Sequence, residues 1–183
     1  MTPSALQRCA IMGLGLLVVV PLAGCKPPPT DADMGRDIAE PAPRFAAAPL
    51  PSPDTTGAIW ARSPNDSDRL IYGVPEQPAL LALECTAADS ELPMLQITRL
   101  SPADRDAGAL LALVGNGHIG RIAVDARDVN GRLVWQGEAA AADTVWEPLA
   151  GPRALGVTVP GAGRVAVNPS IAAMAFIEDC RPG

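Results

Sequence analysis

The chain has 183 residues, of which 48% are hydrophobic, 19% are charged and only 3% are aromatic. Its 14 lysines and arginines stand against 20 aspartates and glutamates, which argues against the basic surface that nucleic-acid binding requires. A single histidine speaks against a histidine-rich metal centre, and the length accommodates one ordinary domain.

Residues 1–24 have the three parts of an export signal. Met1–Arg8 is short and ends on a positive charge, and Cys9–Gly24 is a run of 16 residues without any charge. This run is shorter than the roughly 20 apolar residues that a membrane-spanning helix needs. It ends in small residues directly before Cys25, as at a signal-peptide cleavage site.

The segment Leu22–Cys25 resembles the lipobox of bacterial lipoproteins. The resemblance implies cleavage before Cys25, a diacylglycerol and an acyl chain such as palmitate on this cysteine, and attachment to a membrane without spanning it. In this family an aspartate after the cysteine favours the inner membrane. Lys26 at that position implies the outer membrane, facing the periplasm. An ordinary secretory signal or an uncleaved anchor is the alternative.

Residues 25–56 are expected to form the lipidated cysteine and a proline-rich tether. Eight prolines occur between residues 26 and 56. Because proline fixes φ and lacks a backbone donor, this segment cannot build the interior of a helix or sheet. We expect a spacer between membrane and domain, and a proline-rich ligand for a partner is the alternative.

Residues 57–183 are expected to form a β-rich globular domain. Asn130-Gly131 is typical of a two-residue hairpin turn. Many short strands separated by turn residues predict a small antiparallel β-sandwich or barrel. The expected strands are 70–72, 79–85, 92–100, 109–114, 121–129, 132–136, 154–159 and 164–167.

Two helical pieces are predicted within this domain. Ser101-Pro102 has the pattern of a helix cap followed by a first-turn proline, and predicts one helical turn. Ile171, Met174 and Ile177 recur at three-residue spacing, which predicts a C-terminal helix from about residue 169 to residue 179 with these side chains on one face.

Cysteine usage predicts one disulfide. Cys9 leaves with the signal and Cys25 carries lipid, so Cys85 and Cys180 remain for an oxidising compartment. A bridge between them would stabilise the domain by about 4–5 kcal/mol in the chain-entropy model. Two buried free thiols or a two-cysteine metal site are the alternatives.

Two motifs are interpreted as turns. Gly115–Gly120 matches G-x-G-x-x-G, but the residues that follow alternate as in a strand, whereas a dinucleotide site needs a helix there. Asp128–Gly131 is similar to the start of a calcium loop, but Ala126 and Gly137 stand where acidic ligands are required. We therefore predict no cofactor and no metal.

No catalytic residue is assigned from the sequence. His118 lies in the glycine-rich turn, and no serine has a nucleophile-elbow context. Trp146 and Tyr72 are candidates for partner binding, because exposed aromatic rings anchor interfaces. Packing in the core is the alternative for both.

The sequence thus predicts a membrane-anchored envelope module, not an enzyme, that binds another envelope protein or peptidoglycan or has a structural role. Beyond the lipobox the domain is similar only to small envelope lipoproteins. The arrangement of a lipobox, a small β domain, an early cysteine and a C-terminal cysteine resembles membrane-bound inhibitors of c-type lysozyme, which implies a periplasmic inhibitor as one alternative. An envelope hydrolase is the other, with a carboxylate pair drawn from Asp104, Asp106, Asp125, Asp128, Glu138 and Asp143.

Overall fold

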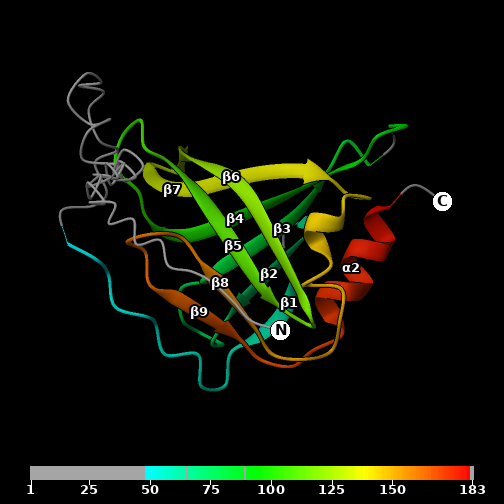
Figure 1. Cartoon of the computed structure of the whole chain (residues 1–183), viewed down its shortest axis with the longest axis horizontal. Coiled ribbons are helices and arrows are strands. Elements are labelled where there is room, and N and C mark those ends of the chain that lie inside the picture. The colour runs from blue at the N-terminus through cyan, green and yellow to red at the C-terminus, as the bar shows by residue number, and fades with distance from the viewer. Residues whose placement is uncertain (1–47, 65, 89, 182–183) are drawn as a thin grey trace, which may run out of the picture. The chain divides into compact units, whose positions relative to one another are not determined.

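A computed structural model describes residues 48–64, 66–88 and 90–181 (Figure 1). The predictions for the export signal, for Cys25 and for residues 26–47 lie outside this part. The elements are β1 (Ile59–Ser63), β2 (Asp66–Gly73), β3 (Leu81–Thr86), β4 (Met94–Pro102), β5 (Gly108–Gly115), β6 (His118–Val129), β7 (Arg132–Ala140), the 3₁₀ helix η1 (Thr144–Trp146), β8 (Leu155–Thr158), β9 (Arg164–Val167) and α2 (Ala172–Cys180).

The strands form one antiparallel sheet of nine strands in the order β1-β2-β3-β4-β7-β6-β5-β8-β9, and the sheet is not closed. This confirms a mostly β fold with a C-terminal helix. The β6–β7 connection is the predicted hairpin turn, because Asn130 and Gly131 have φ values of 54° and 79°. Both values lie in the left-handed region that such a turn requires.

The open side of the sheet is held by side-chain hydrogen bonds. Tyr72 Oη on β2 donates to the carbonyl oxygen of Ala166 on β9 at 3.0 Å, and accepts from the backbone N–H of Asn168 at 2.9 Å. The side-chain amide of Asn168 donates to the carbonyl oxygens of Thr55 and Ala58 at 2.9 and 2.8 Å. These bonds form a seam where a closed barrel would have strand pairing.

The last residues of the expected tether contact the domain. The backbone N–H of Leu50 donates to the carbonyl oxygen of Gly161 at 2.8 Å. Ser52 Oγ accepts from the backbone N–H of Arg164 at 3.0 Å. The segment from residue 50 onward therefore runs beside the β8–β9 hairpin before the chain enters β1.

The inward faces of the strands enclose one hydrophobic core. Trp60 on β1 packs against Tyr72 on β2 with ring centroids 5.1 Å apart, and both are buried. At one end of the sheet, α2 adds the side chains of Ala173, Phe176 and Ile177 to this core (Figure 1). Burial of such apolar surface is the main favourable term in folding.

Cys85 on β3 and Cys180 at the end of α2 form the predicted disulfide. Their Cα atoms are 5.7 Å apart, and the bridge spans 95 residues of sequence. Arg62 on β1 supports the same packing, because its guanidinium lies 2.8 Å from the carboxylate of Asp179 and 4.9 Å from the ring centre of Phe176. The helix is therefore attached to β3 through the disulfide and to β1 through Arg62.

The helical turn predicted at Ser101-Pro102 was wrong. Both residues belong to β4, where the register with β7 shifts between Arg99 and Pro102. The backbone N–H of Ala103 donates to the carbonyl oxygen of Leu133 at 3.0 Å. Pairing with β7 therefore continues through the bulge and overrides the local capping pattern.

Two further details differ from the prediction. The C-terminal helix is present, but its buried face includes Ala173 and Phe176, whereas Ile171 is 63% exposed at the N-cap. The five-residue strand β1, which begins shortly after the proline-rich segment, was not predicted from the sequence.

Candidate functional site

The two aromatic candidates for partner binding are both buried. Trp146 is fully buried, and its indole N–H donates to the carbonyl oxygen of Ala140 at 2.9 Å. Tyr72 is also fully buried, and burial raises the pKa of its hydroxyl, so that the group remains a donor to the seam. Neither ring is accessible to a partner at the surface.

The glycine-rich motif forms the predicted β-turn. Asn116 and Gly117, with φ values of 51° and 85°, connect β5 to β6, and Gly115 is opposite His118. The Asn116 side chain donates to the carbonyl oxygen of Pro148 at 2.7 Å, which fixes the turn against the connection between η1 and β8. A strand follows the motif, so the turn lacks the helix of a dinucleotide site.

Several of the candidate acids have local structural contacts. Asp128 accepts the backbone N–H of Gly131 at 2.8 Å inside the β6–β7 turn. Asp143 accepts the backbone N–H of Val145 at 2.8 Å and caps η1. Asp125 lies 3.6 Å from the guanidinium of Arg127 on the same strand. These three carboxylates therefore stabilise turns or surface pairs.

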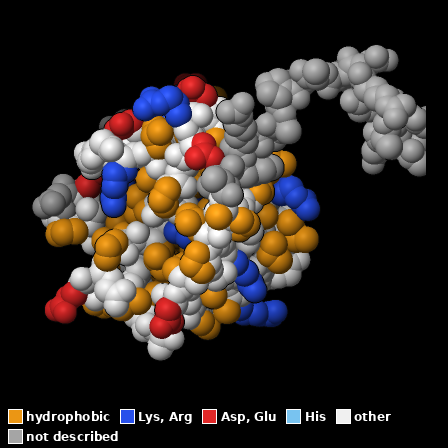
Figure 2. Space-filling model, turned by 90° about the vertical axis from the view of Figure 1, so that its left-hand side faces the viewer, with side chains coloured by type: hydrophobic (Ala, Val, Ile, Leu, Met, Phe, Trp, Pro, Cys, Tyr) orange, Lys and Arg blue, Asp and Glu red, His pale blue; other side chains and the backbone are white. Residues whose placement is uncertain are grey.

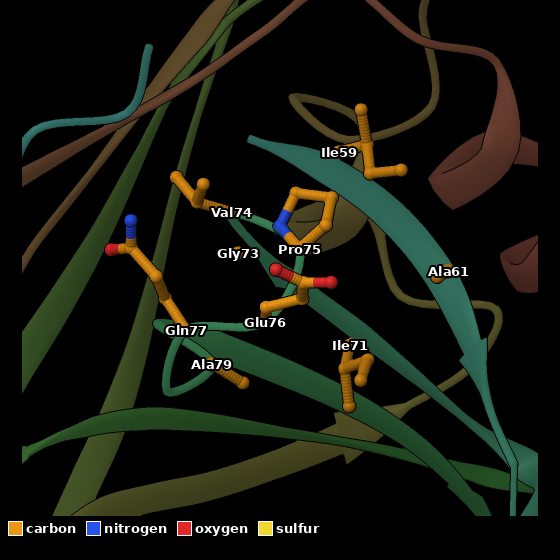
Figure 3. Close-up of a pocket in the computed structure, with 9 residues that line it drawn as sticks. All are labelled: Ile59, Ala61, Ile71, Gly73, Val74, Pro75, Glu76, Gln77 and Ala79. Atoms are coloured by element: carbon orange, nitrogen blue, oxygen red, sulfur yellow. The ribbon is translucent and has the colours of Figure 1, made fainter. Parts of the chain in front are cut away.

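Among the described residues, an apolar pocket of about 230 Å³ lies on the outer face of β1 and β2. Figure 3 shows Ile59 and Ala61 on β1, Ile71 on β2, and the loop after β2 facing them. Apolar side chains make up most of its wall, as in sites that bind apolar groups. The lining residues are Ile59, Ala61, Ile71, Gly73, Val74, Pro75, Glu76, Gln77 and Ala79.

The register of β1 and β2 creates this pocket. Ile59 is opposite Gly73 and Ala61 is opposite Ile71, so these four residues share the outer face of the sheet. Gly73 allows the loop after β2 to lie close to the strand pair, because a Cβ atom at this position would be only 3.1 Å from the Cα of Ala79. The loop from residue 74 to residue 80 then turns back over the strand pair. Because β1 was not predicted, sequence reasoning missed the pocket.

The pocket lies beside an edge of the sheet. Among the described strands, β1 pairs with β2 alone. A second pocket, of about 330 Å³, lies next to β1 toward Asn168, Pro169 and Ser170, and the two pockets share Ile59. Edge strands present backbone N–H and C=O groups that can pair with an added strand. We call β1 with these two pockets the β1-edge site.

Exposed hydrophobic side chains extend beyond this site. Figure 2 shows one side of the molecule, on which hydrophobic side chains lie between basic and acidic ones. Within the described ranges, six large hydrophobic residues are exposed: Ile59, Leu92, Leu110, Val114, Ile119 and Ile171. Three of them, on β5 and β6, lie far from the β1-edge site in the order of the sheet.

One charged side chain is buried inside the sheet. Arg99 on β4 is only 4% exposed, and its guanidinium donates to the carbonyl oxygens of Leu80 and Ala162, each at 3.1 Å. Burial lowers the pKa of Arg99 to about 10. Its Nε, the indole N–H of Trp135 opposite it, and Ser101 Oγ have no hydrogen-bond partner among the described residues. Arg99 thus links β4 to the β8–β9 turn through neutral carbonyls.

No protein-family model, curated protein or solved structure matches the chain significantly. In the part of the chain that the structure describes, none of the helices is long and apolar enough to cross a bilayer.

Proposed function

We propose that this chain is a membrane-anchored lipoprotein of the cell envelope, and that its β domain is a non-catalytic binding module. The lipobox-like segment Leu22–Cys25 supports attachment through lipid on Cys25, at the periplasmic face of the outer membrane. The bridge between Cys85 and Cys180 supports an exported location, because disulfides persist mainly in oxidising compartments.

The observation that carries the binding role is the β1-edge site. An extended segment of a partner would add to the edge of β1 that faces away from β2 through backbone hydrogen bonds, and its apolar side chains would enter the pockets beside Ile59. The partner that suits this site is another envelope protein with an exposed apolar strand.

Peptidoglycan suits the domain less well. Sugar rings pack against exposed aromatic faces, and the aromatic rings of the described residues are buried. Their exposed fractions lie between 0 and 8% for Trp60, Tyr72, Trp135, Trp146 and Phe176.

The proposal is tested by photo-crosslinking in intact cells of the native host. A photoreactive amino acid in place of Ala61, at the wall of the pocket, is expected to give an adduct of one defined mass. The substitution Ile71→Asp in the same chain is expected to abolish this adduct, because it places a charge in the pocket. Cell fractionation of the same strains is expected to find the chain with membranes, and the intact mass of the extracted chain is expected to correspond to a chain that starts at acylated Cys25.

The matched control carries the photoreactive group in place of Leu92, which is 74% exposed in the β3–β4 connection. Equal adducts from both positions would refute the β1-edge site. A full-length chain without an acyl group on Cys25 in the membrane fraction would refute the lipid anchor.

A further inference from the structure

Two segments that form β8, β9, β5 and the first part of β6 contain no acidic residue, and the acids of β6, Asp125 and Asp128, lie in its second part. Residues 57–183 hold fifteen aspartates and glutamates and ten arginines. None of these acids falls in residues 107–124, which form β5 and the first part of β6, or in residues 148–177, which contain β8 and β9. The same two segments hold Arg121, Arg153 and Arg164. Because β6, β5, β8 and β9 are neighbours in the sheet, the charge is segregated in space.

The outer face of these strands is apolar. On β5, Leu111 and Leu113 point into the core, so Leu110 and Val114 point outward. Val114 is opposite Ile119 on β6 and shares its face. The exposed fractions of Leu110, Val114 and Ile119 are 56, 50 and 61%. Half of the large exposed hydrophobic side chains of the described residues thus lie on one face.

Two arginines lie on the same face. Arg121 is opposite Ala112, an outward position between Leu110 and Val114. The side chain of Arg164 lies over Gly156, because a Cβ atom added to Gly156 would be 2.4 Å from the Nε of Arg164. Gly156 is opposite Val114, so Arg164 lies on the face of Val114. This arrangement combines apolar surface with positive charge. We call it the β5–β8 face, composed of Leu110, Val114, Ile119, Arg121 and Arg164.

The chain runs beside this face where it enters the domain. Leu50 and Ser52 form hydrogen bonds to Gly161 and to the backbone of Arg164, on the β8–β9 hairpin. The residues before Leu50 lead toward Cys25. The attachment point of the tether and the β5–β8 face therefore involve the same hairpin.

We propose that the β5–β8 face docks on the surface of a bilayer that contains anionic phospholipid, an inference that rests on the proposed lipid anchor. Arginines near such a surface are attracted to its negative potential, and exposed apolar side chains enter the interfacial region. A second copy of the chain suits this face less well. Symmetric pairing through the face would bring Arg121 and Arg164 of both copies together, and like charges oppose association.

The test uses the mature chain, residues 25–183, with Cys25→Ser so that no lipid contributes. Sedimentation with vesicles is expected to show binding to mixed phosphatidylglycerol and phosphatidylcholine but not to pure phosphatidylcholine, and binding is expected to fall with added salt. Arg121→Gln is expected to weaken binding about fivefold, from the contribution of one arginine near an anionic surface. Ile119→Ser is expected to weaken it about tenfold through lost apolar burial.

The matched controls are Arg127→Gln, at the other end of β6, and Leu92→Ser in the β3–β4 connection, and both are expected to bind like the parent chain. The face is refuted if the parent chain binds neither kind of vesicle, or if the controls weaken binding as much as the test variants. A concentration-dependent dimer that Ile119→Ser disrupts would assign the face to a second copy and overturn the proposal. Because the Cys25→Ser chain carries no acyl group, these outcomes do not depend on whether Cys25 is acylated in the native protein.

Discussion

The most unusual single residue is Arg99, a buried cation whose hydrogen-bond partners are neutral. The carbonyl oxygen of Leu80 also accepts the backbone N–H of Leu100. Among the described residues, the carbonyl oxygen of Ala162 has Arg99 as its hydrogen-bond donor. Burial disfavours the charged form and lowers the pKa of Arg99 to about 10. Because the folded-state pKa lies below the unfolded value, the buried charge costs stability below about pH 10, and this cost falls as the pH rises above it.

Substitution of Arg99 should therefore separate the cost of its charge from the value of its contacts. Arg99→Met keeps most of the apolar volume and removes the charge, so we expect the free energy of unfolding to change by no more than about 1 kcal/mol. Arg99→Lys keeps a buried charge but cannot span both carbonyls, and should lose about 2–3 kcal/mol. Urea unfolding at pH 7 measures both. A Met variant as unstable as the Lys variant would contradict this account.

At the scale of elements, the sequence predicted the strands whose signals are local. The turn at Asn130-Gly131 carries its own conformational requirement, and the alternation in β6 and β7 extends from it. β1 was not predicted, because Ile59–Ser63 is short and follows prolines, and only its pairing with β2 makes it a strand. The β1-edge site could not be predicted either, since it requires Ile59 and Gly73 to face each other across that pair.

The seam between β2 and β9 is another feature that depends on distant residues. Tyr72 and Asn168 are separated by 96 positions, and no local pattern relates them. Their contacts replace the strand pairing that would close the sheet, so they hold the last strand and the start of the helical segment against β2. The burial of Tyr72 follows from this role, which a search for exposed aromatic residues could not reveal.

Tyr72→Phe should weaken this seam without creating a cavity. The change leaves the carbonyl of Ala166 and the N–H of Asn168 without the hydroxyl, and we expect a loss of about 1–2 kcal/mol in the free energy of unfolding. Hydrogen exchange at the Asn168 amide should accelerate more than exchange in the β6–β7 hairpin. Thr158→Val, at an exposed position on β8, serves as the control. Unchanged exchange at Asn168 in Tyr72→Phe would show that the hydroxyl does not hold the seam.

For the whole molecule, two predictions are confirmed: the chain is mostly antiparallel β-sheet with a C-terminal helix, and Cys85 is paired with Cys180. The strand pattern predicted a sandwich or barrel, whereas the nine strands form one sheet that is not closed. The surfaces proposed for binding had no comparable signal. The acid-free segments 107–124 and 148–177 are far apart in sequence, and only the strand order brings them together.

The disulfide connects the end of the chain to the sheet and therefore acts on the molecule as a whole. The bridge closes a loop across 95 residues, so its removal enlarges the unfolded ensemble and should cost about 4–5 kcal/mol. We expect urea unfolding of the Cys85→Ser/Cys180→Ser chain to give a free energy of unfolding that is lower by this amount. The reduced parent chain should give the same value. Because α2 also packs through Phe176 and Ile177, the reduced protein should keep its β-sheet circular dichroism at low denaturant. Equal stability of the oxidised and reduced parent chains would mean that packing alone holds the helix.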